Sequence, residues 1–228
     1  MKRRRAVVAI AAASFIAACG PPFVATEGLT YTVQPGDTLY AIAWRLDLDH
    51  RDIARWNHLG SNYRISVGQV LKVSPDGSEM TPRARTAKRP APAARSAPPA
   101  DSGPAVDWTW PAAGQVIGPV AQPTGGFGLR VLGKRGDPVR SAAAGRIVYS
   151  GTALKNYGHL IIVKHSNSLL SAYGHNESVL VSEGQQVVKG QAIAQMGLGP
   201  GQRAALYFEI RLNGKSVDPS AYLPHRSR

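Results

Sequence analysis

The hydrophobic positions between residues 30 and 74 change their spacing from strand-like to helix-like and back. Apolar and polar residues alternate over residues 31–33, and a turn followed by a second such run closes the segment at 67–73. Between these runs apolar residues recur three and four positions apart, which is typical of amphipathic helices. The helical positions are Leu39, Ile42, Ala43, Leu46, Ile53 and Trp56. The pattern predicts a small domain of strand, helix, helix and strand, with Asp37 or Thr38 capping the first helix.

From residue 108 onward the hydrophobic pattern is that of short strands. β-Branched and aromatic residues gather in segments 144–151, 160–165, 170–173 and 206–212, each bounded by turn residues. No segment of this region keeps helical periodicity over three turns. The pattern over residues 108–228 therefore predicts an all-β domain with a closed or sandwiched antiparallel sheet.

The two predicted domains are separated by a change in composition at residues 75–107, which are rich in Pro, Ala, Ser and Arg. Such a segment buries too little apolar surface to offset its chain entropy, so we expect an extended, solvated linker. Alternatively, its positive charges mark a specific docking site, although a basic Pro/Ala tether needs no partner to be explained. The fold class is thus multidomain.

The first residues indicate export. A cationic head over residues 2–5 precedes a short apolar stretch that ends at Cys19, the only cysteine. This stretch is shorter than the roughly 20 residues of a membrane-spanning helix, so residues 1–18 are expected to be a signal peptide. The run 16–19 resembles a bacterial lipobox, which implies that Cys19 carries a lipid and that residues 19–29 form a tether. The alternative is an ordinary secretory peptide in which the cysteine is incidental.

Net charge then narrows the choice of partners. The chain carries +13, and removal of the four head charges leaves 13 − 4 = +9. A basic chain binds either nucleic acid or an acidic surface such as an anionic envelope. An exported protein has no access to nucleic acid. The residue after Cys19 is Gly20, not the Asp that commonly retains lipoproteins in the inner membrane. By family analogy we expect a lipid anchor in the outer membrane, with the protein on the periplasmic face.

The smaller domain contains several fixed elements in a fixed order, at residues 31–39, 42–43, 53–57 and 65–71. Together they resemble a LysM module, which implies a βααβ fold that binds N-acetylglucosamine-containing glycan, and hence peptidoglycan, in a shallow groove. Each groove residue has a structural alternative, because Asp37 can cap a helix and Leu39 and Ile65 can fill the core. The groove residues expected from the resemblance are Gly36, Asp37, Thr38, Leu39, Ile65, Val67, Gly68 and Gln69.

The second domain resembles the LytM-type M23 family of zinc endopeptidases, most closely its NlpD and EnvC branch, over residues 110–223. The matching segments are 110–111, 144–151, 157–165, 170–176, 187–194 and 206–211. Active members hold zinc with the His and Asp of an H-x-x-x-D segment and the second His of an H-x-H strand. The first segment falls on residues 126–130, so its two ligand positions carry Gly126 and Arg130. The H-x-H positions carry Ala205 and Tyr207, and only His175, which matches an assisting catalytic position, remains.

One imidazole cannot hold zinc tightly or replace the Lewis acid that activates water. We therefore expect no catalytic residue, metal or cofactor. His159 and His165 offer no substitute site, because a strand separates them by about 20 Å at the usual rise.

The resemblance implies a peptidoglycan-binding lipoprotein that activates N-acetylmuramoyl-L-alanine amidases during septal wall splitting and daughter-cell separation. Arg130, His175, Ala205 and Tyr207 are the candidate amidase contacts in the degenerate cleft. The alternatives are a passive wall anchor and an active zinc endopeptidase with rearranged ligands.

Overall fold

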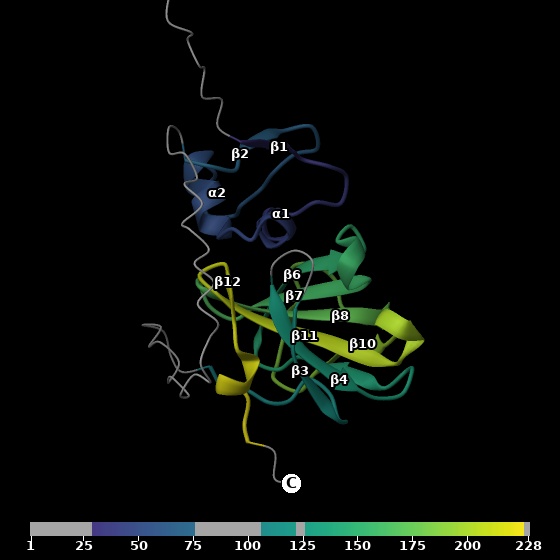
Figure 1. Ribbon diagram of the computed structural model, residues 1–228. Helices are drawn as coiled ribbons and strands as arrows, with labels where there is room; N and C mark the ends of the chain where they lie inside the picture. The colour runs from purple at the N-terminus through teal and green to yellow at the C-terminus, as the bar shows by residue number, and fades with distance from the viewer. Residues whose placement is uncertain (1–28, 76–105, 122–125, 226–228) are drawn as a thin grey trace, which may run out of the picture.

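The computed structural model describes residues 29–75, 106–121 and 126–225. The expectations for the signal peptide, for Cys19 and for most of the linker lie outside these residues. A small domain with two helices sits against one face of a larger β-domain (Figure 1). Along the described chain, no helix is both long and apolar enough to cross a membrane.

The small domain has the predicted βααβ order, with β1 (Thr30–Thr32), α1 (Leu39–Leu46), α2 (His50–Trp56) and β2 (Val70–Lys72). Strands β1 and β2 pair antiparallel. The Thr38 side chain accepts a hydrogen bond from the Ala41 amide at 3.1 Å and so caps α1. Asp49 caps α2 by accepting from the Arg51 amide at 2.9 Å. These caps satisfy amides that have no partner within the helix, and the predicted fold of this domain is confirmed.

The β-domain is built on one 10-stranded antiparallel sheet, whose main path is β3-β4-β11-β8-β7-β6-β9. Strands β5 and β10 pair with each other, β10 also pairs with β8, and β12 pairs with β11. This arrangement confirms the predicted all-β antiparallel class. The strands are β3 (Val116–Ala121), β4 (Phe127–Leu132), β5 (Pro138–Arg140), β6 (Gly145–Gly151), β7 (His159–Lys164), β8 (Leu169–Val179), β9 (Gln186–Val187), β10 (Ala192–Met196), β11 (Ala205–Leu212) and β12 (Lys215–Val217).

Each domain has its own apolar core. In the small domain Leu39, Ile42 and Ile53 are buried together with Leu71 of β2. In the β-domain the main core lies on one side of the sheet and includes Ile161, Tyr173 and Phe208. Leu46, which the helical spacing placed with the core, is 36% exposed, so it contributes little to the packing.

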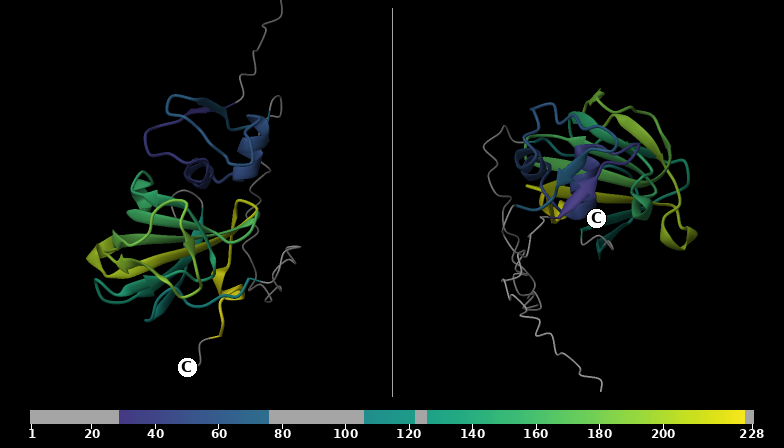
Figure 2. Two further views of the ribbon diagram at one scale, coloured as in Figure 1. Left: turned by 180° about the vertical axis from the view of Figure 1, so that it is seen from behind. Right: turned by 90° about the horizontal axis from the view of Figure 1, so that it is seen from above.

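Helix α1 has a second apolar face that packs on the β-domain. The view from behind shows the helix next to the β-domain (Figure 2). Ala41 and Trp44 lie three positions apart and therefore on one side of the helix. They share a buried cluster with side chains from the other side of the sheet: Tyr149, Leu154, Tyr157, Leu160, Ile162, Leu170, Ala172 and Tyr207. The small domain, whose own core is marginal for its size, thus gains a second packed surface.

Polar contacts hold the same interface. Arg211 of β11 donates to the Trp44 carbonyl at 3.2 Å, and Lys215 donates to the Asp47 carbonyl at 2.7 Å. At the β11–β12 turn the fit is so close that a Cβ on Gly214 would lie 2.6 Å from the Asp49 nitrogen. The turn needs glycine for this approach and for its positive φ of 75°.

Candidate functional site

The candidate cleft lies where β4, β11 and β8 run side by side. Arg130 of β4 pairs in register with Tyr207 of β11, and Tyr207 pairs with Gly174 of β8. His175 follows Gly174, and its ring centroid is 6.1 Å from that of Tyr207. The structure therefore brings together Arg130, His175 and Tyr207, which are up to 77 positions apart in the sequence.

Most of these side chains are inaccessible in this arrangement. Ala205 and Tyr207 are fully buried, His175 is 7% exposed, and Arg130 is half-buried. Tyr207 belongs to the same buried cluster as Ala41 and Trp44 of α1. Helix α1 of the small domain therefore covers the Tyr207 end of the cleft.

A buried hydrogen-bonded network surrounds Tyr207. Glu209, which is completely buried, accepts from the Tyr207 hydroxyl at 2.8 Å, from Arg211 Nε at 2.7 Å and from the Ser216 hydroxyl at 2.6 Å. Gly126 lies directly beside it, since a Cβ there would be 2.8 Å from Glu209 Oε1. A ligating side chain at position 126 would therefore collide with the network unless Glu209 moved.

The protonation of the cleft residues also disfavours a metal. Burial and the neighbouring Glu209 carboxylate strongly raise the pKa of the Tyr207 phenol, so it remains a hydrogen-bond donor. Burial and the nearby Arg130 guanidinium lower the pKa of His175, which leaves its ring neutral. Zinc takes imidazole and carboxylate donors. Positions 126, 130, 205 and 207 instead carry a glycine, a guanidinium, a methyl group and a protonated phenol, which do not fit zinc. Elsewhere in the described residues, His, Cys, Asp and Glu form no group of three that could hold a metal ion.

The alternative histidines have structural roles or lie apart. His165 Nδ1 is 2.8 Å from the Ala144 carbonyl, and its Nε2 is 2.7 Å from the Ser171 hydroxyl. Both ring nitrogens are thus occupied, and burial lowers the pKa of His165 to about 4. His159 pairs across the sheet with Asn176 at the opposite end of β7.

Several of the expected glycan-binding residues have structural roles in the small domain. Asp37 accepts from the Tyr31 hydroxyl at 2.6 Å and from the Gln34 amide at 2.9 Å. Thr38 caps α1, and Leu39 is buried in the core. Gly36 and Gly68 have positive φ values of 80° and 83° and shape the two turns. Ile65 packs against the core and Gln69 accepts from Ser66 at 3.0 Å, whereas Val67 is 65% exposed.

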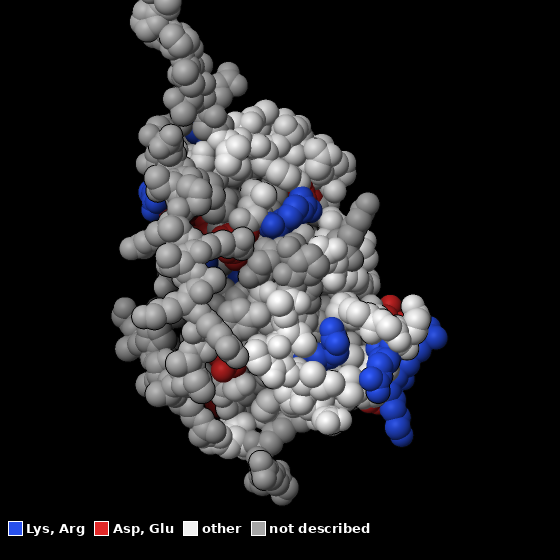
Figure 3. All heavy atoms as spheres, in the orientation of Figure 1, with Lys and Arg blue, Asp and Glu red and all other residues white. Residues whose placement is uncertain are grey.

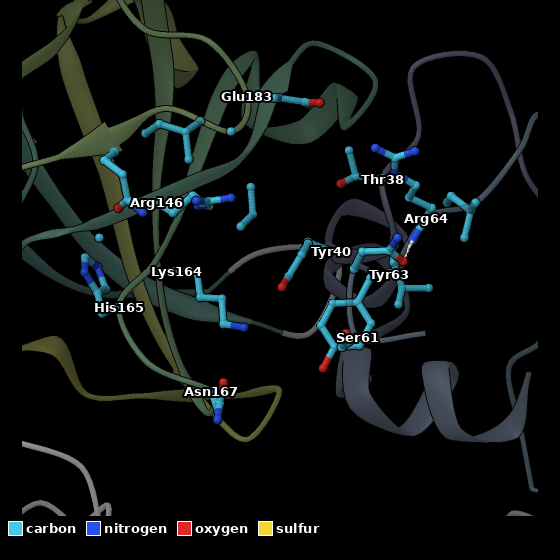
Figure 4. Close-up of a pocket in the computed structure, with 18 of the residues that line it drawn as sticks. Thr38, Tyr40, Ser61, Tyr63, Arg64, Arg146, Lys164, His165, Asn167 and Glu183 are labelled. Atoms are coloured by element: carbon cyan, nitrogen blue, oxygen red, sulfur yellow. Dashed lines mark hydrogen bonds between the residues drawn. The ribbon is translucent and has the colours of Figure 1, made fainter. Parts of the chain in front are cut away.

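Part of this predicted groove opens into a cavity of about 1030 Å³ between the two domains (Figure 4). The small domain contributes residues 37–40 and 61–65, and the β-domain contributes residues 145–148, 164–167, 183, 184 and 186. A second cavity of about 480 Å³ shares Asp37, Thr38 and Glu183 with the first. No sequence pattern points to the side chains of the β-domain that face the groove, because only the docking of the two domains brings them there.

Two family profiles match the chain: the LysM domain at residues 31–74 and Peptidase family M23 at residues 124–219. Among solved structures, a zinc-containing peptidase from Vibrio cholerae aligns at 24% identity and a TM-score of 0.43, covering 53% of this chain and 41% of that one. The catalytic domain of lysostaphin from Staphylococcus simulans aligns at 22% identity and a TM-score of 0.41, covering 50% of this chain and 90% of that one.

Curated relatives match most of the chain. A protein named murein hydrolase activator NlpD from Escherichia coli is 37% identical, over 88% of this chain and 69% of its own length. The lipoprotein YgeR from the same species is 40% identical, over 87% of this chain and 82% of its own length. The lipoprotein NlpD/LppB homolog from Pseudomonas aeruginosa is 40% identical, over 86% of this chain and 77% of its own length. The chain therefore belongs to the NlpD/LppB lipoprotein family, with a LysM domain followed by an M23 domain.

Proposed function

We propose that this protein is an outer-membrane lipoprotein that binds peptidoglycan through its LysM domain and activates an N-acetylmuramoyl-L-alanine amidase without cutting the wall itself. Family membership supports the activating role, since relatives such as that of Escherichia coli are named murein hydrolase activators. The expected lipid on Cys19 supports the location. The activity would serve septal wall splitting and daughter-cell separation.

The observation that carries the non-catalytic part of the proposal is the chemistry of the degenerate cleft. By the resemblance to M23 peptidases, Gly126, Arg130, Ala205 and Tyr207 fall where active members carry the His-x-x-x-Asp and His-x-His residues. Tyr207 donates to a buried Glu209 that is already paired with Arg211. Without a Lewis acid to activate water, this site cannot hydrolyse a peptide by the family mechanism.

We place the amidase contact at the rim of the cleft, centred on Arg130, because arginine is a common anchor of protein interfaces. His175, Ala205 and Tyr207 would join the contact only after α1 of the LysM domain moved away from them. Activation would follow if the protein bound the open form of the amidase more tightly than its inhibited form, because only differential affinity shifts such an equilibrium.

Dye release from labelled sacculi tests the proposal. The protein alone should release no dye, with or without added zinc, and an amidase should release dye faster when the protein is present. Dye release by the protein alone that stops on chelation would show an endopeptidase. A protein that binds sacculi but leaves several amidases unstimulated would be a passive anchor.

Two substitutions locate the contact. Arg130→Ala should lower stimulation while binding to sacculi is unchanged, whereas Arg140→Ala, an exposed arginine on β5, should lower neither. Trp44→Ala should loosen the cover over Tyr207 and raise stimulation. Equal stimulation by wild type and Arg130→Ala would rule out this position as the contact.

A further inference from the structure

The cavity between the domains has a wall from each of them. Figure 4 shows Lys164 pointing from the M23 domain toward Tyr40 and Tyr63 of the LysM domain. The Lys164 ammonium lies 5.9 Å and 5.7 Å from the centroids of these two rings. The volume of about 1030 Å³ is at the upper end of the roughly 300–1,000 Å³ typical of small-ligand sites. The space is therefore large enough for an oligosaccharide and its substituents.

Positive charge dominates the lining. Arg64, Arg146 and Lys164 line the cavity, and none of the three forms an ion pair with another described residue. The Arg146 guanidinium is 3.3 Å from the neutral side-chain amide of Gln186, when that amide is oriented to donate to the Gly145 carbonyl. Burial and the guanidiniums of Arg51 and Arg146 lower the pKa of Lys164, as expected where positive charges gather. Figure 3 shows one face of the molecule, on which basic and acidic side chains lie together near the junction of the two domains and a larger basic group lies at the far end of the β-domain.

The acidic residues of the lining do not balance these cations. Asp37 already accepts from Tyr31 and pairs with Arg45 at 3.2 Å. Glu183 is exposed and, within the described residues, accepts a hydrogen bond from the Ser150 amide alone, at 3.1 Å. Three unpaired cations around one unpaired carboxylate favour an anionic ligand, because charge-assisted hydrogen bonds form best with carboxylate oxygens.

We propose that the LysM groove and the M23 domain form one composite site for a carboxylate-bearing muramyl glycan, with Tyr40 and Tyr63 beside the sugar and Arg146 and Lys164 on the carboxylate. A polymer of N-acetylglucosamine alone is neutral. Peptidoglycan carries carboxylates in its stem peptides, and in the lactyl groups of muramic acid once the peptides have been removed. Aromatic faces suit sugar rings, and a guanidinium suits a carboxylate in two-pronged geometry. The inference rests on the proposed wall binding and adds the class of glycan that the site selects.

The test is calorimetric titration of the soluble protein with three ligands: a neutral N-acetylglucosamine tetrasaccharide, a peptide-free glucosaminyl-muramyl tetrasaccharide, and a disaccharide tetrapeptide. Both anionic ligands should bind roughly tenfold or more tightly than the neutral one, which corresponds to about 1.4 kcal/mol. Comparison of the two anionic ligands shows whether the lactyl or the peptide carboxylate is the better source. The preference should shrink as salt rises from about 0.02 to 0.5 M, because screening weakens exposed charge pairs.

Charge-removing variants separate the composite site from the LysM groove itself. Arg146→Met and Lys164→Met, alone and together, should abolish the preference for anionic ligands, because they should weaken anionic binding far more than binding of the neutral tetrasaccharide. Glu183→Gln keeps the hydrogen bond to the Ser150 amide and should strengthen anionic binding. Lys134→Met, which removes one charge at an exposed position away from the cavity lining, is the matched control and should change neither affinity.

The possible failures are distinguishable. A wild-type protein that binds neutral and anionic glycans equally overturns the composite site and leaves the proposed wall binding intact. A double variant that keeps the anionic preference also overturns it. A wild-type protein that binds none of the three ligands overturns the proposed wall binding as well.

Discussion

Arg211 is a buried cation that joins the degenerate cleft to the LysM domain, and its removal should destabilise both. It is 1% exposed, donates to Glu209 Oε1 at 2.7 Å, and lies 3.5 Å from Asp47 of the LysM domain. Its guanidinium carbon is 4.0 Å from the centroid of the Trp44 ring. Arg211→Ala would leave the Glu209 carboxylate buried with two neutral donors and no counter-charge.

Breaking a buried ion pair on one side costs about 3–5 kcal/mol. That loss is a large part of the roughly 5–15 kcal/mol by which proteins are stable. For a chain of this length it corresponds to a fall in Tm of about 6–20 °C. Replacing both partners, as in Arg211→Met with Glu209→Gln, should recover most of the loss, because no charge is then left unpaired in the interior.

Guanidinium chloride unfolding of the soluble protein, followed by circular dichroism and tryptophan fluorescence, measures the effect. The single variant should be much less stable than the double variant. The reasoning is wrong if Arg211→Ala unfolds within about 1 kcal/mol of wild type, or if the double variant is no more stable than the single one.

Three further substitutions test the packing of the cleft and the domain interface. Trp44→Ala should cost about 3–5 kcal/mol and increase the radius of gyration in solution scattering, because Trp44 packs on the M23 domain rather than in the LysM core; an unchanged radius would contradict this. Burial lowers the pKa of His50, which is 3% exposed, to about 4, so below pH 6.5 the unfolded chain binds the proton first. Stability should therefore fall by about 3 kcal/mol as the pH drops from about 6.5 to 4, and His50→Gln should flatten that slope; parallel slopes would exclude His50 as the cause. Gly126→Ala should cost about 1–3 kcal/mol, since its Cβ would lie 2.8 Å from Glu209, whereas Gly60→Ala, with 3.6 Å of clearance, should cost less; equal losses in urea unfolding would refute the tight fit.

The strands rich in β-branched and aromatic residues could be predicted from the sequence, and those that depend on close strand approach could not. Strands β6, β7, β8 and β11 follow the predicted segments. Strand β4 was not predicted, because its second residue, Gly128, is typical of a turn in sequence. In the structure a Cβ at Gly128 would lie 2.3 Å from the Phe208 carbonyl oxygen, so glycine is what allows β4 to approach β11. Strand β3 contains Gly118 and Pro119, which also disfavour a strand assignment.

The four candidate cleft positions are predicted from the resemblance to M23 peptidases, but what covers them could not be inferred from local pattern. Helix α1 has one face with Leu39 and Ile42 and another with Ala41 and Trp44. Each face satisfies a 3.6-residue period, so periodicity alone cannot show that the second face packs on another domain. The partners of Trp44 are distant in the sequence, and the contact through Arg211 spans 167 positions.

The two faces of α1 connect the interdomain cavity to the cover over Tyr207. Tyr40 lines the cavity, whereas the neighbouring Ala41 belongs to the cluster that buries Tyr207. The composite cavity exists only while the LysM domain is docked, so a ligand that fills it must favour the docked arrangement. If the docked form bound the ligand tenfold more tightly, the ligand would stabilise the cover by about 1.4 kcal/mol. By the same linkage, a partner that needed Tyr207 exposed would weaken glycan binding tenfold. A partner that contacted only the half-exposed Arg130 would leave glycan affinity unchanged, so glycan affinity measured with and without the amidase separates these two modes of activation.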